Sequence, residues 1–130
     1  MQTKRRTSLI FPVFQARRRI AITAFLAFLI DDLSKSLALR KLPNHPVKVV
    51  GDFLKLDIRY NSGAAFNIAA SHTILLSSLA IGMVFALFYF SSKVTNLTWA
   101  LALGLVLGGI LGNLSDRIFR PPGGLQGQVV

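Results

Sequence analysis

Two long runs of apolar residues without a single charge dominate the second half of the chain. Residues 73–90 form the first run and residues 97–115 form the second, with a short polar segment between them. A bilayer core of about 30 Å is crossed by roughly 20 residues of α-helix. The pattern therefore predicts two membrane-spanning helices, over about 72–90 and 97–115, that are joined as a hairpin.

An earlier apolar run is followed closely by charged residues. Residues 20–30 carry no charge, but Asp31, Asp32 and Lys35 come next, before the apolar pattern ends near residue 39. A secretory signal peptide is the alternative, because the length and the basic flank fit, but no small-x-small cleavage site follows. We therefore predict a span over about 20–39, whose charges need partners or a water-filled cavity.

Helical spacing places particular side chains of these spans on shared faces. Asp31 and Lys35 are four residues apart and can pair, either only to hold helix packing or as part of a site. Small residues recur at the same spacing and end at Asp116 in the last span, which predicts close helix packing. The small-residue positions are Ala100, Gly104, Gly108 and Gly112 in the last span, and Ser78, Gly82 and Ala86 in a matching groove of the middle span.

The loop between the first two spans, residues 40–71, contains a strand pattern. Apolar and polar residues alternate over 54–60, and a period of two is typical of a half-buried strand. Residues 61–63 then predict a turn, and the small apolar residues 64–70 are expected to return along the membrane surface. We expect a small strand-bearing platform on the outer face, and the alternative is a solvated hairpin that merely connects helices.

Composition places the chain among small polytopic membrane proteins. Its 130 residues suggest one domain, and 52% hydrophobic with only 15% charged residues is unusual for a soluble protein. The net charge of +10 could suit nucleic acid, but the uncharged apolar runs argue against such a partner. The absence of Cys excludes disulfides, thiolate metal sites and a cysteine nucleophile, and two His are too few for a histidine metal cluster.

Basic residues give only a slight preference for one orientation in the membrane. An inward N-terminus places seven Lys or Arg on each side. The first span usually has the largest influence on orientation, and three Arg directly precede it here, which favours a cytoplasmic N-terminus. The basic tail, residues 1–19, would also attract anionic lipid headgroups.

Four motifs occur in an order that resembles one family of membrane peptidases. The bacterial prolipoprotein signal peptidases, or signal peptidase II, carry Asp-x-x-Ser/Thr-Lys, Asn-x-Gly-Ala-Ala-Phe, Gly-Gly-x-x-Gly-Asn-x-x-Asp-Arg and Val-Val-Asp-Phe. Each motif alone is weak, but the ordered set across residues 20–130 is strong. The similar stretches here are 31–35 (Asp-Asp-Leu-Ser-Lys), 59–66 (Arg-Tyr-Asn-Ser-Gly-Ala-Ala-Phe), 108–117 (Gly-Gly-Ile-Leu-Gly-Asn-Leu-Ser-Asp-Arg) and 128–130 (Gln-Val-Val).

The resemblance implies an aspartic endopeptidase of the bacterial inner membrane. Such an enzyme removes the signal peptide of a diacylglyceryl-modified prolipoprotein just before the lipidated Cys, and needs no metal or cofactor. The implied fold is mostly α, a polytopic membrane helix bundle of four spans with a small extracytoplasmic β platform and cytoplasmic termini. The expected partners are the prolipoprotein substrate and membrane lipid, and we expect a monomer.

The resemblance assigns supporting roles but no catalytic residue. One catalytic Asp of the family would follow Val130 directly, and the other would lie on a fourth span. We therefore expect a truncated relative that is inactive by itself, with a tail over 1–19, one incomplete membrane domain over 20–130 and an extracytoplasmic end over 116–130. The residues that match supporting or substrate-orienting positions are Asp31, Lys35, Asn61, Gly63, Asn113, Asp116 and Arg117.

A hypothesis from a different functional class remains open. The chain could be a non-enzymatic small membrane protein, or a degenerate family member, that binds lipid or lipoprotein. The high positive charge and the absence of the two catalytic Asp motivate this alternative.

Overall fold

The described part of the chain forms three helices and one small sheet, so the expectation of a mostly helical fold with a small sheet is confirmed. The computed structural model describes residues 3–42, 45–61 and 72–130, with side chains from residue 13 onward. In chain order the elements are α1 (Thr3–Lys41), β1 (Val47–Val50), β2 (Leu54–Leu56), α2 (Thr73–Ser91) and α3 (Leu97–Phe119).

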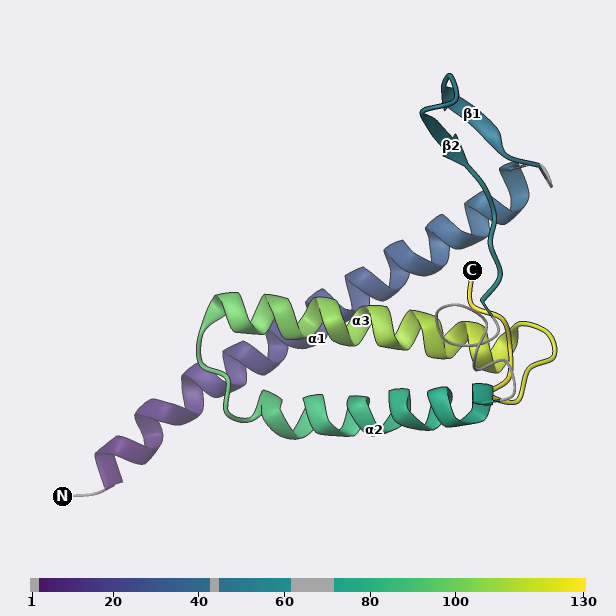
Figure 1. Ribbon diagram of the computed structural model, residues 1–130. Helices are drawn as coiled ribbons and strands as arrows, with labels where there is room; N and C mark the ends of the chain where they lie inside the picture. Colours follow the sequence, from purple (N-terminus) through teal and green to yellow (C-terminus); the bar gives the residue numbers. More distant parts are fainter. Residues whose placement is uncertain (1–2, 43–44, 62–71) are drawn as a thin grey trace.

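The long helix α1 crosses α3, and α2 lies along the other side of α3 (Figure 1). The crossing is close because small residues of α3 face α1. A Cβ atom added at Gly108 would lie 2.5 Å from the Cβ of Ala27 and 2.6 Å from the carbonyl oxygen of Ala24. One added at Gly104 would lie 2.6 Å from the Cβ of Thr23. The predicted role of this stripe in close packing is therefore confirmed.

The small residues of α2 do not form the groove that their spacing predicts. Ser78 and Gly82 are exposed, and a Cβ atom at Gly82 would meet nothing within 4 Å. The buried residues of α2 are instead Thr73, Ser77 and Ser91. Ser77 is held by its hydroxyl, which donates to the carbonyl of Leu125 at 2.7 Å. The prediction was wrong because small side chains permit a close approach but do not determine which face is approached.

The ends of α3 follow from local sequence. Asn96 caps the first turn, because its side-chain oxygen accepts the Thr98 amide at 2.7 Å. Two prolines follow at 121–122, and proline cannot continue a helix because it lacks an amide donor. Because these prolines come only after residue 120, the helix extends past the predicted end at residue 115. Asp116 and Arg117 therefore lie on its last turns.

The helix α1 begins at Thr3, so helical structure also includes most of the basic segment 1–19. Lys and Arg are good helix formers, which favours this extension.

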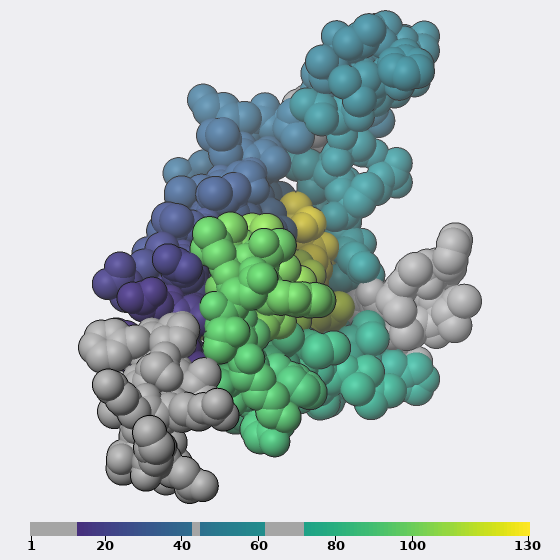
Figure 2. Space-filling model, turned by 90° about the vertical axis from the view of Figure 1, so that its left-hand side faces the viewer, coloured from purple at the N-terminus to yellow at the C-terminus, as the bar shows by residue number. Residues whose placement is uncertain are grey.

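The sheet is a hairpin that stands clear of the helices (Figure 2). Val47 pairs with Leu56 and Lys48 with Lys55 in an antiparallel register, and the turn contains Gly51 at φ +51°. Only 54–56 of the predicted strand over 54–60 pairs as β2, and its residues are exposed rather than half-buried. The reason is that no described helix packs against this hairpin. The segment 62–70, with Gly63 and most of the predicted turn, lies outside the described residues.

Asp52 stabilises the turn of this hairpin through two ion pairs. Its carboxylate binds Lys48 at 2.8 Å and Lys55 at 2.9 Å. These two hydrogen bonds lower the pKa of Asp52 below its usual value. The carboxylate therefore remains ionised across the physiological range.

Two helices, α2 and α3, are long and apolar enough to cross a membrane. Only 11% of the apolar stretch in α2 and 22% of that in α3 is buried within the protein. Phe85 and Phe88 on α2 and Leu105 on α3 are among the exposed large side chains. This distribution suits helices that face lipid, since the core helix of a soluble protein would be mostly buried. The third span, predicted over 20–39, stays a prediction.

Candidate functional site

Lys35 lies at the centre of a buried polar cluster between α1 and α3. Its ammonium group contacts the Asp31 carboxylate at 2.6 Å, and the predicted pairing of these two residues along α1 is confirmed. The same nitrogen contacts the Asp116 carboxylate on α3 at 2.9 Å and donates to the Asn113 side-chain oxygen at 3.2 Å. Lys35 is only 9% exposed, so two carboxylates and one amide oxygen, rather than bulk water, surround its ammonium group. The contact with Asp31 is an ion pair only, since the Asp31 Oδ2 atom has no hydrogen-bond partner among the described residues.

Asp116 connects α3 to the segment that follows it. One carboxylate oxygen accepts a hydrogen bond from the Arg120 side chain, and the other accepts the Val130 backbone amide at 3.3 Å in addition to Lys35. Asp116 is 3% exposed. Two cations and an amide therefore compensate the cost of burying this charge, and the aspartate is fixed in position.

The segment after α3 folds back over the cluster. The Gly127 amide donates to the Arg117 carbonyl at 2.9 Å, and a Cβ atom at Gly127 would overlap the backbone of Asp116 and Arg120. Val129 and Asn61 exchange two backbone hydrogen bonds, of 2.7 and 3.0 Å. Figure 1 shows the C-terminus beside the chain that follows β2. Asn61 is thereby attached to the segment that contacts Asp116.

Arg117 is buried but incompletely bonded. It is 8% exposed, and its Nη1 atom has no hydrogen-bond partner among the described residues. A buried donor without a partner costs free energy. The guanidinium is therefore suited to an acceptor that binds at this end of α3.

A cavity of about 280 Å³ opens next to this cluster. It is lined by Leu39, Tyr60, Arg120, Pro121 and Gln128, which come from α1, the chain after β2 and the segment after α3. The cavity therefore lies where the elements of the cluster converge.

The structure brings together most of the residues predicted from the sequence. Asp31, Lys35, Asn113 and Asp116 are in direct contact, Arg117 adjoins them, and Asn61 is connected through Val129. Gly63 lies outside the described residues. Sequence reasoning missed Arg120, although it follows Asp116 by the same spacing of four that identified the pair on α1. It also missed Ser77 and Gly127, for which the sequence carries no comparable signal.

The geometry positions charges but does not itself form a pair of carboxylates that share a proton. Lys35 lies between Asp31 and Asp116, and no two carboxylates are hydrogen-bonded to each other in the part of the chain that is described. The cluster is therefore a scaffold that holds neighbouring groups in place.

A comparison with protein families accounts for this combination of motifs. Residues 23–130 match the family described as Signal peptidase (SPase) II. The chain belongs to the signal peptidase II family. All seven supporting residues predicted from the sequence lie within the matched range of this family. The resemblance drawn from the four motifs is confirmed.

Curated relatives agree with the signal peptidase II assignment. A lipoprotein signal peptidase of Streptomyces coelicolor is 42% identical over 120 residues, which cover 89% of this chain and 59% of the relative. One of Streptomyces griseus is 44% identical, covering 82% of this chain and 55% of the relative. One of Mycolicibacterium smegmatis is 42% identical, covering 92% of this chain and 51% of the relative. This chain thus spans between half and three-fifths of the length of these relatives. No solved structure matches it significantly.

Proposed function

We propose that this chain supplies the framework of a prolipoprotein signal peptidase, an aspartic endopeptidase of the bacterial inner membrane. Its substrate would be a diacylglyceryl-modified prolipoprotein, cut just before the lipidated Cys. Membership of the signal peptidase II family supports this class of activity. The observation that carries the proposal is the buried cluster around Lys35, because it joins residues from two of the motifs that define the resemblance.

The proposed arrangement in the membrane has three spans and a cytoplasmic N-terminus. Gly104, Gly108 and Gly112 of α3 meet Thr23, Ala27 and Asp31 of α1 in the same order along both helices, so α1 and α3 run in the same direction. The Lys35 cluster then lies at the end of the bundle opposite to the basic N-terminal segment. With a cytoplasmic N-terminus, the site would lie toward the extracytoplasmic side, where a translocated prolipoprotein would present its signal peptide.

The catalytic step would need two further carboxylates. One, acting as a base, would activate water, and the other, acting as an acid, would donate a proton. The resemblance places one of these groups directly after the Val-Val pair. Because the Val130 amide binds Asp116, the next position along the chain would lie close to the Lys35 cluster. Asp31, Lys35 and Asp116 would then position the catalytic groups without reacting themselves.

A cleavage assay tests this function directly. Residues 1–130 would be compared with a chimera that continues them with the corresponding C-terminal part of the Streptomyces coelicolor lipoprotein signal peptidase, 42% identical to this chain. We expect the chimera to cleave a diacylglyceryl-modified prolipoprotein and to ignore a substrate whose Cys is replaced by Ser. We expect no turnover by residues 1–130, because Asp31 and Asp116 are both held by Lys35 and no described pair of carboxylates shares a proton.

Two outcomes would contradict the proposal. Turnover by residues 1–130 would show that the catalytic carboxylates are among those already described. A chimera that inserts and binds the lipidated substrate, but never cleaves it, would favour a binding protein over a peptidase.

Replacing Arg117 with Ala in the active chimera should lower the cleavage rate at least tenfold. The unpartnered Nη1 atom of Arg117 is available to orient substrate or a catalytic carboxylate, and misplacement of such groups lowers rates strongly. Ile118→Ala is the matched control, because Ile118 is adjacent but exposed. The rate constant should fall while the insertion of both variants stays equal. An unchanged rate for Arg117→Ala would remove this residue from the site.

A further inference from the structure

An apolar groove lies between the three helices at the end opposite to the Lys35 cluster. Its volume is about 260 Å³. The hydroxyl of Ser91, which also borders the groove, donates to the carbonyl of Phe88 at 2.6 Å and so offers no free donor. Apart from Arg17, the groove is therefore lined by apolar surface. The apolar lining residues are Ile20 and Ala21 on α1, Leu87 and Phe88 on α2, and Leu103 and Leu107 on α3.

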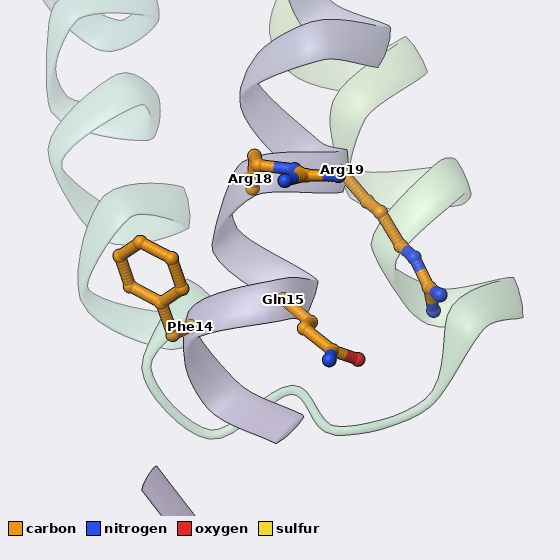
Figure 3. Close-up of a pocket in the computed structure, with 4 residues that line it drawn as sticks. All are labelled: Phe14, Gln15, Arg18 and Arg19. Carbon is orange, nitrogen blue, oxygen red and sulfur yellow. The ribbon is translucent and has the colours of Figure 1, made fainter. Parts of the chain in front are cut away.

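Among the residues whose side chains are described, Arg17 is the single ionic group that lines this groove, and it has no acidic partner within reach along α1. The five acidic residues of the chain are all Asp, and the first of them is Asp31. At 1.5 Å of rise per residue, Asp31 is about 21 Å away from Arg17 along the helix axis. Arg18 and Arg19 line a separate cavity of about 330 Å³ (Figure 3) and add to the same positive potential. This end of the protein therefore offers three exposed guanidinium groups to an anion from outside the chain.

Aromatic residues mark the membrane interface at the same end. The turn between α2 and α3 lies beside the start of the apolar part of α1, because Val94 packs against the cluster that Ala16 and Ile20 form with Ala100. On either side of this turn, Tyr89 and Trp99 are 63% and 65% exposed. Trp and Tyr concentrate where lipid headgroups meet the hydrocarbon core. Arg17 is thus placed at the level of the headgroups, and the groove continues from it toward the hydrocarbon.

We propose that this groove binds one acyl chain of an anionic phospholipid whose phosphate pairs with Arg17. A soluble anion would leave the apolar walls of the groove exposed, and a neutral lipid would leave Arg17 without a counter-ion. An anionic phospholipid meets both requirements. Its negatively charged headgroup can lie beside Arg17 at the membrane interface while its acyl chain occupies the apolar groove. The proposal concerns binding only and does not depend on peptidase activity.

Trp99 provides the measurement, because it is the only Trp of the chain. It lies beside Leu103, which also lines the groove. Fluorescence of the 130-residue protein in nanodiscs would be quenched by phosphatidylglycerol with brominated acyl chains, in comparison with equally brominated phosphatidylcholine. We expect half-maximal quenching at a mole fraction about fivefold lower for phosphatidylglycerol, the preference that one basic residue at a membrane surface provides. Equal quenching by both lipids would overturn the proposal.

Two matched pairs of variants distinguish a lipid bound in the groove from a general electrostatic attraction of anionic lipid to the basic surface. Arg17→Gln should remove the preference for phosphatidylglycerol, whereas Arg18→Gln, with the same change in charge, should retain most of it. Ala21→Phe should fill the groove and weaken quenching by both lipids, whereas Ile22→Phe on the neighbouring position should not. Equal effects of the two Arg variants would indicate only a diffuse surface potential and would overturn the proposal.

Further outcomes distinguish other occupants of the groove. Inorganic phosphate added at millimolar concentration should not relieve the quenching, and relief would indicate a site for a soluble anion instead. If Ala21→Phe leaves quenching unchanged, another protein segment rather than lipid covers the groove, and the proposal fails.

Discussion

Replacing Lys35 with Met should lower the free energy of unfolding by about 3–5 kcal/mol, the range found when one partner of a buried ion pair is removed. The substitution keeps a similar length but removes the charge that lies between two carboxylates. Asp116 would keep the Arg120 side chain, whereas Asp31 forms no other ion pair among the described residues. Unfolding in mixed micelles by titration with sodium dodecyl sulfate would measure the loss.

Single changes of the neighbouring aspartates provide the controls for Lys35. Asp31→Asn should cost less than Lys35→Met, because a neutral amide in the same place is less costly to bury than a lone carboxylate. Combining Lys35→Met with Asp31→Asn should recover part of the loss. Asp32→Asn is the matched control on the next position, and it should leave stability nearly unchanged. Equal losses for Lys35→Met and Asp32→Asn would show that the cluster does not stabilise the fold.

Replacing Gly108 with Ala should destabilise the protein by about 1–3 kcal/mol, the usual effect of forcing an extra carbon into a packed interface. The new Cβ atom would lie 2.5 Å from the Cβ of Ala27 and 2.6 Å from a backbone oxygen of α1. The backbone cannot yield as a flexible side chain would, so α1 and α3 must separate. The Lys35 cluster would loosen as a result, because its members come from both helices. Unfolding in mixed micelles would again measure the change in the free energy of unfolding.

The adjacent Gly109 offers a control that differs only in its face. A Cβ atom there would meet nothing within 4 Å. Gly109→Ala should therefore stabilise α3 by up to about 1 kcal/mol, because Ala is the better helix former. If Gly108→Ala and Gly109→Ala change stability equally, the contact between α1 and α3 is looser than this packing requires.

The two spacing-of-four patterns indicate which face of α1 and which face of α3 are suited to close contact. Four contacts between the two parallel helices follow one register. They join Thr23 to Gly104, Ala27 to Gly108, Asp31 to Gly112 and Lys35 to Asp116. Both patterns were recognised, and each was assigned a face correctly. The register that aligns them was not predicted, because a local period specifies a face of one helix but not its partner or its offset.

The hairpin and α2 illustrate the opposite case. Alternation over 54–60 predicted one half-buried strand, but pairing ends at Leu56 and the side chains are exposed. Burial depends on what packs against a strand, and a period of two carries no information about that. The buried face of α2 likewise includes Ser77, whose hydroxyl bonds to a carbonyl 48 residues later in the chain.

The sequence alone predicted three helical segments, the pairing of Asp31 with Lys35 and the packing role of the glycine stripe. It also predicted the family to which the chain belongs. These features depend on residues that are near one another in the chain or on motifs in a defined order. The tertiary structure decided that Lys35 also binds Asp116, that Asn61 joins the final residues and that a groove forms beside Arg17. Each of these depends on the relative placement of elements far apart in sequence, which is set by the sum of all packing contacts rather than by any local pattern.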